Sequence, residues 1–215
     1  MRDYFESDAR YLKLDIPFDH KLMLAEAQAL RHRFIPHRYD ESSHRGWSSL
    51  SLYGLHESKT ENWDEYGYAS GADAAKDFVW TDAAKECPTI MNFLLNSFPC
   101  KKYGRVRLML LEPGGWIGMH SDGKMKFVEN VNVALNNPLG CKWLWNNGQE
   151  LIMAPGSMYA MNLSYQHSVI NESDEDRFHL IIAKHDSTDE WKLTMNMAAT
   201  LAGVTGTYVP LDMYA

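Results

Sequence analysis

The spacing of apolar residues along the chain changes near residue 103. Before that point, apolar positions recur every three or four residues in two segments, as expected of amphipathic helices. The first segment covers residues 20–33 between Pro17 and Pro36, and the second covers residues 90–98 after Pro88, a residue tolerated in a first helical turn. Residues 1–102 are therefore predicted to form a support of helices and some strands.

Between residues 105 and 184, short apolar runs alternate with strong turn signals such as Asn146-Asn147-Gly148. Runs of this length and spacing predict strands. The predicted strands cover residues 105–111, 116–120, 127–135, 141–145, 150–153, 157–163, 166–170 and 178–184, with a turn at Pro113-Gly114-Gly115 between the first two. Many short strands in one stretch favour a mainly β fold, a double-stranded β-helix or cupin-like jelly roll, over a parallel α/β sheet.

The remaining segments fit around this strand-rich region. Apolar spacing predicts a C-terminal helix over residues 189–202, and the acidic stretch ESDED at 172–176 is predicted to be an exposed loop. A length of 215 residues, without a repeat or a linker, suits one domain. We therefore expect a single domain over 1–215, with a support (1–102), a jelly-roll core (103–186), flanking helices at both ends and a helical tail (187–215).

Composition narrows the range of partners. Hydrophobic residues make up 45% and charged residues 23% of the chain, as in ordinary folded proteins. The net charge of −7 and the absence of a Lys/Arg stripe argue against a nucleic-acid partner. The sequence has no apolar stretch long enough for a membrane span, and the three cysteines have no metal-site spacing. We expect a cytoplasmic protein with reduced thiols and no membrane partner.

Three residues in the strand-rich region form a candidate metal site. His120 and Asp122 are two positions apart, which places their side chains on the same side of an extended strand, and His167 follows on another predicted strand. Two imidazoles and one carboxylate leave coordination positions open, the arrangement that non-haem Fe(II) oxygenases use. These three residues are the predicted metal ligands and catalytic centre.

Arg177 indicates a bound co-substrate, which a metal site alone would not require. It follows His167 by ten residues and begins the next predicted strand. A guanidinium is a forked, permanently charged donor that suits the distal carboxylate of 2-oxoglutarate. Each residue means little alone, because His-x-Asp pairs arise by chance. Their order within a predicted jelly roll indicates a site for Fe(II), 2-oxoglutarate as co-substrate, and O2.

These residues also carry a resemblance to a known family. Residues 107–186 resemble the aspartyl/asparaginyl β-hydroxylase group of 2-oxoglutarate oxygenases, through LMLLEPGGWIGMH, WLWNNGQELIM, NLSYQHSVINESDEDR and RFHLIIAKHD. The first 100 residues match more loosely, chiefly through SLSLYGL. The resemblance implies that His120 and His167 bind iron and that Arg177 binds 2-oxoglutarate.

The chain departs from the animal members of that group at two places. Those enzymes have glycine two positions after the first histidine, whereas Asp122 completes the triad here, as in bacterial or phage-type relatives. They also use an arginine and a histidine on the following strand, where this chain has Asn130 and Asn132. By the same resemblance Tyr53 is a candidate contact to the co-substrate, and Ser164 is a further candidate for lining the site.

The predicted function is therefore a 2-oxoglutarate-dependent dioxygenase. It would hydroxylate an unactivated C–H of an amino acid or of a peptide or protein residue, with release of succinate and CO2. A free-proline-type small-molecule hydroxylase is one alternative, and a cupin-like module that binds a metal or a carboxylate without turnover is another. The sequence leaves the substrate and the oligomeric state open.

Overall fold

Strands make up most of the regular structure in the computed structural model, which describes residues 3–123, 126–184 and 186–210. The strands are β1 (Asp3–Glu6), β2 (Tyr11–Leu14), β3 (Ile35–Pro36), β4 (His44–Gly54), β5 (Val79–Trp80), β6 (Tyr103–His120), β7 (Val128–Ala134), β8 (Cys141–Trp145), β9 (Glu150–Leu151), β10 (Met158–Asn162), β11 (His167–Asn171), β12 (Arg177–Lys184) and β13 (Thr207–Pro210). The α-helices are α1 (His20–Ala29), α2 (Gly71–Ala74), α3 (Asp82–Lys85), α4 (Pro88–Asn92) and α5 (Asp189–Ala202).

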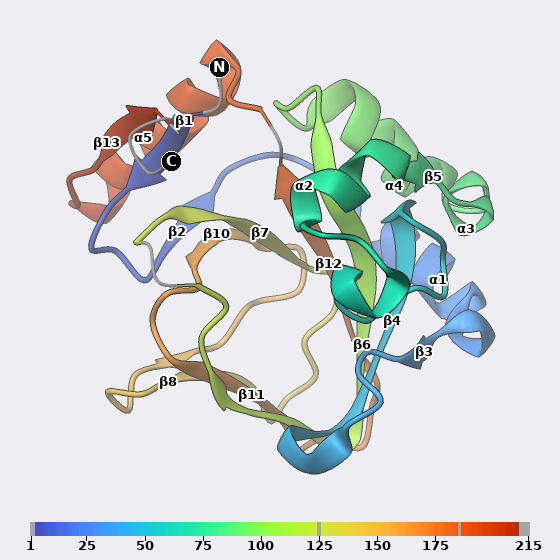
Figure 1. Ribbon diagram of the computed structural model, residues 1–215. Coiled ribbons are helices and arrows are strands. Elements are labelled where there is room, and N and C mark those ends of the chain that lie inside the picture. Colours follow the sequence, from blue (N-terminus) through green and yellow to red (C-terminus); the bar gives the residue numbers. More distant parts are fainter. Residues whose placement is uncertain (1–2, 124–125, 185, 211–215) are drawn as a thin grey trace.

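Most of the strands belong to one antiparallel sheet that curls on itself. Its order is β2-β10-β7-β12-β6-β11-β8-β9, and β4 pairs with β6 and carries the short strands β3 and β5. β1 and β13 form a separate two-stranded sheet. In Figure 1 the curl brings β8 and β11 opposite β2, β10 and β7. The predicted mainly β, jelly-roll class is confirmed.

Strand β6 forms the corner between the two layers. Its first half pairs with β12, where Leu111 lies opposite Arg177, and its second half pairs with β11, where His120 lies opposite His167. At the bend, a Cβ on Gly115 would lie 2.7 Å from the carbonyl oxygen of Glu112, so only glycine fits. The prediction of two strands with a turn between them was wrong, because β4 pairs with β6 on both sides of the bend.

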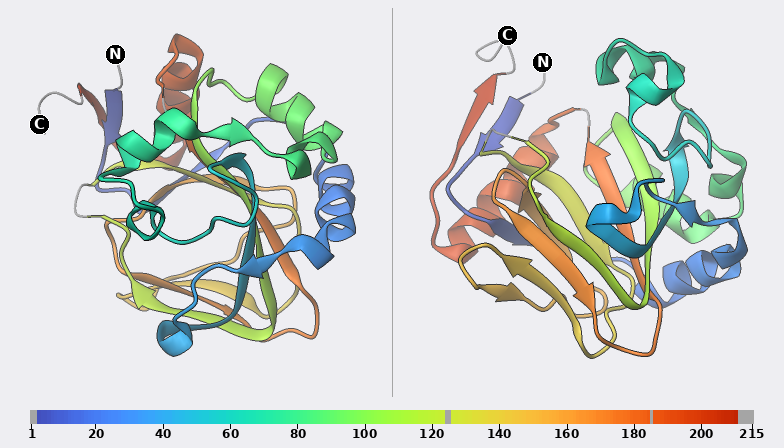
Figure 2. Two further views of the ribbon diagram at one scale, coloured as in Figure 1. Left: turned by 45° about the vertical axis from the view of Figure 1, so that its right-hand side comes forward. Right: turned by 60° about the horizontal axis from the view of Figure 1, so that its bottom comes forward.

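Two apolar clusters lie on opposite faces of the sheet, because successive side chains of a strand point to opposite sides. The larger cluster fills the space between one layer and the helices, and it includes Leu108, Leu180 and Trp191 of α5. Figure 2 shows the helices gathered along the outside of that layer. The smaller cluster lies on the inward faces of the curled sheet and includes Trp145 and Tyr159. Polar residues on these inward faces are the ones available for chemistry.

The predicted helices are present, with shifted ends. Helix α1 begins after Asp19, whose carboxylate accepts from two backbone N–H groups, and gives way to a 3-10 turn at 31–33. Residues 88–97 form α4 followed by one π-helical turn. Helix α5 spans the predicted 189–202 and ends at Gly203 with φ of 66°. None of the helices in the described ranges combines the length and apolarity needed to cross a membrane.

The terminal segments contribute more strand than expected. β2 and β4 come from the predicted N-terminal support and join the main sheet, while β13 follows α5 and pairs with β1. The expected division into support, core and tail stays a prediction. Residues 211–215 of the predicted helical tail lie outside the described residues.

Candidate metal and co-substrate site

The fold brings the predicted metal ligands together. His120 is the last residue of β6 and lies directly opposite His167, the first residue of β11. Asp122 follows the end of β6, where its backbone N–H donates to the carbonyl of Leu163 at 3.0 Å. The three potential ligand atoms lie within 4.8 Å of one another, and Nε2 of His120 is 3.5 Å from Oδ1 of Asp122. Bonds of about 2.1 Å to one ion place neighbouring ligands about 3 Å apart, so a metal ion would draw this set only slightly closer.

Backbone carbonyls orient both imidazoles. Nδ1 of His120 lies 2.8 Å from the carbonyl oxygen of Gly118, and Nδ1 of His167 lies 2.9 Å from that of Tyr165. A carbonyl oxygen can only accept, so each neutral ring carries its proton on Nδ1 and its lone pair on Nε2. Burial lowers the pKa of His167, which favours the neutral form that binds metal. Both rings are therefore prepared for coordination through Nε2.

Aromatic rings close one side of the triad. Trp143 stacks on His167 with ring centroids 4.6 Å apart and an interplanar angle of 13°, and Trp145 meets the same ring at 5.8 Å. His167 is 2% exposed, whereas the side chains of His120 and Asp122 are 35% and 52% exposed. The triad is thus accessible from the side of His120 and Asp122. This donor set, two nitrogens and a carboxylate with one accessible side, fits Fe(II).

Arg177 is buried on the inward face of β12, where it has hydrogen-bond partners but no ion-pair partner among the described residues. Its Nε donates to Oδ1 of Asn137 at 3.2 Å, and its Nη2 donates to Nδ1 of His179 at 3.0 Å. No described carboxylate lies within ion-pair distance of Arg177, which is only 6% exposed. Burial lowers the pKa of Arg177 to about 10, so the group remains charged at neutral pH.

The environment of Arg177 fits the distal carboxylate of 2-oxoglutarate. His179 accepts from Arg177 at Nδ1, so its proton is on Nε2, and that buried atom has no hydrogen-bond partner in the part of the chain that the structure describes. An uncompensated buried cation is costly, and an unpaired buried N–H beside it adds to that cost. A carboxylate bound there would satisfy the cation and could also accept from the second donor.

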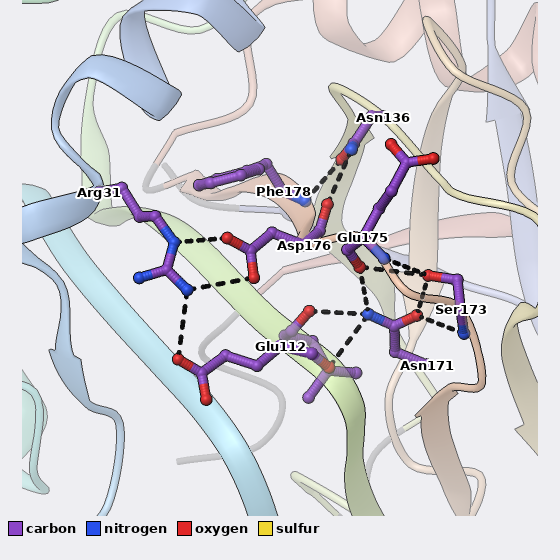
Figure 3. Close-up of polar contacts among 9 residues, drawn as sticks. Arg31, Glu112, Asn136, Asn171, Ser173, Glu175, Asp176 and Phe178 are labelled. Atoms are coloured by element: carbon purple, nitrogen blue, oxygen red, sulfur yellow. Dashed lines mark hydrogen bonds and ion pairs between the residues drawn. The ribbon is translucent and has the colours of Figure 1, made fainter.

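A polar network fixes the loop that leads into Arg177 (Figure 3). Asn136 clamps both neighbours of Arg177, because its Nδ2 donates to the carbonyl of Asp176 at 2.9 Å and its Oδ1 accepts from the N–H of Phe178 at 2.6 Å. The carboxylate of Asp176 is paired with Arg31 at 2.5 Å. The predicted exposed loop 172–176 is therefore anchored at its C-terminal end, where it positions Arg177.

The other predicted site residues occupy three different surroundings. Asn130 and Asn132 lie on the inward face of β7, opposite Met161 and Tyr159 of β10. Ser164 lies in the turn before β11, and its hydroxyl donates to Oδ1 of Asn162 at 2.7 Å.

Tyr53 is not brought to the site. It follows a register shift in the pairing of β4 with β6 and packs on the larger cluster, where its ring meets Phe78 and Trp80. Its side chain is therefore on the face of the sheet that the helices cover, away from the triad.

Sequence reasoning missed several inward polar residues. Arg105 and Arg107 lie on the same face of β6 as Met109 and Leu111, and Nη1 of Arg107 donates to His37 at 3.3 Å. The alternation of Arg105-Val106-Arg107-Leu108 in a predicted strand was the available signal, since residues two apart share a face. This alternation does not indicate which face of the strand points inward.

The sequence matches the model of the aspartyl/asparaginyl β-hydroxylase family over residues 18–185. Because this match spans most of the chain, the protein belongs to that family, whose members are 2-oxoglutarate-dependent hydroxylases. The predicted resemblance is confirmed at this level. No curated protein gives a significant match.

Solved structures with a similar fold include other oxygenases. A prolyl-4-hydroxylase from Pseudomonas putida is 15% identical, with a TM-score of 0.46, over 84% of this chain and 95% of its own. A viral collagen prolyl hydroxylase from Paramecium bursaria Chlorella virus-1 is 13% identical, with a TM-score of 0.44, over 84% and 98%. A Trichoplax adhaerens prolyl hydroxylase in complex with a hypoxia-inducible-factor peptide is 11% identical, with a TM-score of 0.47, over 87% and 88%.

Proposed function

We propose that this protein is an Fe(II)- and 2-oxoglutarate-dependent dioxygenase that hydroxylates an unactivated C–H of an amino acid or peptidyl residue. The observation that carries the proposal is the triad, in which His120, Asp122 and His167 present two oriented Nε2 lone pairs and a carboxylate within 4.8 Å. Family membership supports the reaction class. The burial of Arg177, which has no ion-pair partner among the described residues, supports 2-oxoglutarate as the co-substrate.

In this proposal each residue has a defined task. His120, Asp122 and His167 would hold the metal and leave its remaining positions for 2-oxoglutarate and O2. When bound, iron would supply the oxidising chemistry with O2 as the oxidant and 2-oxoglutarate as the electron donor, and one oxygen atom would enter succinate and the other the hydroxylated substrate, with release of CO2. Arg177 would bind the distal carboxylate and so orient the co-substrate, while Trp143 and Trp145 exclude water from the His167 side.

The test separates binding from turnover. Under anaerobic conditions, Fe(II) with 2-oxoglutarate should give a visible charge-transfer band in the wild-type protein and none in His120→Ala. Under O2, succinate should form from 2-oxoglutarate in the wild type only. Asn147→Ala changes an exposed turn residue and is the control. Equal iron binding and equal succinate formation in wild type and His120→Ala would refute the proposal.

The same experiment, repeated with free amino acids and peptides, covers both alternatives. A cupin-like binding module would take up metal and 2-oxoglutarate, with the charge-transfer band present, yet would form no succinate with any amino acid or peptide. The free-proline-type enzyme would instead respond to free proline and not to peptides.

A further inference from the structure

Two buried asparagines end consecutive strands with the same local structure. Asn162 ends β10 and Asn171 ends β11, and neither side chain is accessible to solvent. In each case Oδ1 accepts from the N–H and the hydroxyl of the serine two residues further on, at 3.3 and 2.7 Å from Ser164 and at 3.1 and 2.6 Å from Ser173. We call these two arrangements the Asn162 clamp and the Asn171 clamp.

The Asn162 clamp joins the end of β10 to the N-terminal segment, residues 7–10. Nδ2 of Asn162 donates to the carbonyls of Ser7 and Ala9 at 3.1 and 3.2 Å, and its backbone N–H donates to the carbonyl of Arg10 at 2.9 Å. A side-chain amide has two N–H donors, so both are used. The pairing of β10 with β7 shifts register just before Asn162. The clamp therefore fixes the chain at a point where the strand pairing is irregular.

The loop that follows, residues 163–166 between β10 and β11, supports two of the three proposed metal ligands. The carbonyl of Leu163 accepts from the backbone N–H of Asp122 at 3.0 Å. The carbonyl of Tyr165 accepts from Nδ1 of His167 at 2.9 Å. The position of this β10–β11 loop therefore affects both where Asp122 lies and which nitrogen of His167 carries the proton.

The N-terminal segment also holds the β10–β11 loop from its outer side. The hydroxyl of Tyr165 donates to the carbonyl of Asp8 at 3.1 Å, and the guanidinium carbon of Arg10 lies 4.4 Å from the centroid of the Tyr165 ring. The hydroxyl of Ser7 donates to the carbonyl of Thr205, after α5, at 2.8 Å. The N-terminal segment thus lies between the β10–β11 loop and the chain that follows α5, and it is tied to both.

We propose that Asn162 is a positioning residue of the metal site, which orients Asp122 and His167 by fixing the β10–β11 loop against the N-terminal segment. This inference rests on the proposed function for the identity of the site. In the described part of the chain, the hydrogen bonds of the Asn162 side chain go to the N-terminal segment and to Ser164, and not to a metal ligand. Asn162 therefore acts through the backbone of the loop.

The Asn171 clamp provides a matched control. It has the same residue type, the same burial and the same serine contacts, but its Nδ2 donates to the carbonyls of Leu111, Glu112 and Glu175, on the side of Arg177. An effect that comes only from lost stability should appear when either clamp is removed. An effect on ligand position should appear only when the Asn162 clamp is removed.

The experiment measures metal affinity separately from turnover. The proteins are wild type, Asn162→Ala, Asn171→Ala and Tyr165→Phe, which loses the hydroxyl contact with Asp8 but keeps the backbone carbonyl. The probe is Co(II), which binds the same nitrogen and oxygen ligands as Fe(II) and is stable in air. One readout is the Co(II) dissociation constant from isothermal titration calorimetry. A second is the set of ring ¹⁵N chemical shifts of the metal-free protein, at a pH where His167 is neutral. The thermal midpoint confirms that each variant is folded.

Removal of the Asn162 clamp should weaken metal binding. Asn162→Ala should raise the Co(II) dissociation constant about tenfold, the low end of the loss expected for an outer partner of a metal ligand. Asn171→Ala should leave the constant within about twofold, because separate sites act independently. In metal-free Asn162→Ala, the ring nitrogens of His167 should show both tautomers. Those of His120 should stay unchanged, because the carbonyl of Gly118 orients that ring.

Two results would overturn the inference: a Co(II) dissociation constant of Asn162→Ala equal to that of the wild type, or an equal rise for Asn162→Ala and Asn171→Ala. The second result would make Asn162 a residue of general stability. If Asn162→Ala does not fold, Tyr165→Phe decides, because the loss of one hydrogen bond to the N-terminal segment should raise the constant about threefold. An unchanged constant in Tyr165→Phe would then overturn the inference.

Failure of the proposed function is seen separately. If the wild type binds Co(II) but forms no succinate with Fe(II), the enzyme proposal fails while the comparison of the clamps still stands. If the wild type does not bind Co(II), the ring ¹⁵N shifts still decide, because the tautomer of His167 does not require a metal. A single Nδ1–H tautomer in both the wild type and Asn162→Ala would then overturn the inference.

Discussion

Replacing Asn171 tests whether the network in Figure 3 holds Arg177, the proposed ligand of the co-substrate, in place. Asn171 ends β11 and is 0% exposed. Its Nδ2 donates to the backbone carbonyls of Leu111, Glu112 and Glu175 at 2.9, 3.0 and 2.8 Å. Its Oδ1 accepts from the N–H and the hydroxyl of Ser173. One side chain thus ties β6 to the loop that ends at Arg177.

The expected loss of stability follows from these contacts. Asn171→Ala removes two N–H groups, which the three carbonyls share, and the Oδ1 that accepts from Ser173; at about 1 kcal/mol for each of these three groups, the free energy of unfolding should fall by about 3 kcal/mol. Asn171→Asp has nearly the same shape but places carboxylate oxygens against those carbonyls, so it should cost more. Because that burial raises the pKa of the new carboxyl in the folded state, the loss should be smaller near pH 4 than at pH 7.

Urea unfolding at the two pH values measures these losses, and the KM for 2-oxoglutarate reports the position of Arg177. Asn147→Ala, which removes one exposed turn contact, should cost less than about 1 kcal/mol. Equal stability of Asn171→Asp and Asn171→Ala at pH 7, or an Asn171→Asp loss that grows on acidification, would refute the reasoning. If Asn171→Ala folds and its KM for 2-oxoglutarate is unchanged, the network does not control the position of Arg177.

Three further predictions follow from buried polar groups. Arg177→Met should raise the KM for 2-oxoglutarate about 10- to 100-fold, with Arg177→Lys less affected, and steady-state kinetics that give equal values for all three proteins would contradict the assignment. Lys184→Met removes the ammonium that lies 3.0 Å from the carboxylate of Glu129, so the free energy of unfolding, measured with urea, should fall by about 3–5 kcal/mol. The double variant Lys184→Met/Glu129→Gln should recover part of this loss. Burial raises the pKa of both Cys87 and Cys100 to about 12. Iodoacetamide at pH 8 should therefore alkylate these thiols about a thousandfold more slowly in the folded than in the unfolded protein, and the rate should rise with pH. Equal alkylation rates in the two states, measured by mass spectrometry, would count against burial as the cause.

The sequence pattern predicted many of the strands and helices, because the formation of each element depends on the short-range spacing of apolar residues. β8 and α5 have the predicted bounds, since each is a periodic run that ends at strong turn or cap residues. The bend in β6 escaped prediction because Pro113-Gly114-Gly115 is typical of a turn, and only pairing with β4 on both sides makes it a corner. The strand pairing of β13 with β1 joins opposite ends of the chain, which no local pattern can indicate.

The residues of the candidate site likewise fall into those that the sequence pattern could predict and those that it could not. His120, Asp122, His167 and Arg177 could be predicted as candidates from order and spacing, because the proposed chemistry prescribes these residue types. Their backbone acceptors and the unpaired Nε of Arg107 could not be found, since they depend on strand register and on which face curls inward. Tyr53 illustrates the same limit, because one register shift in β4 places it under the helices.

The geometry of β6 explains why one strand can serve both halves of the proposed chemistry. Its straight first half carries Arg107 on the inward face, and its second half ends at His120, while the bend at Gly115 turns the strand from one layer to the other. Because β12 pairs with the first half of β6 and β11 with the second half, the same strand also fixes the position of Arg177 relative to His120 and His167. The relative placement of the proposed metal ligands and of Arg177 then depends on strand pairing rather than on mobile loops, which is how a site gains the fixed orientation that the proposed oxidation needs.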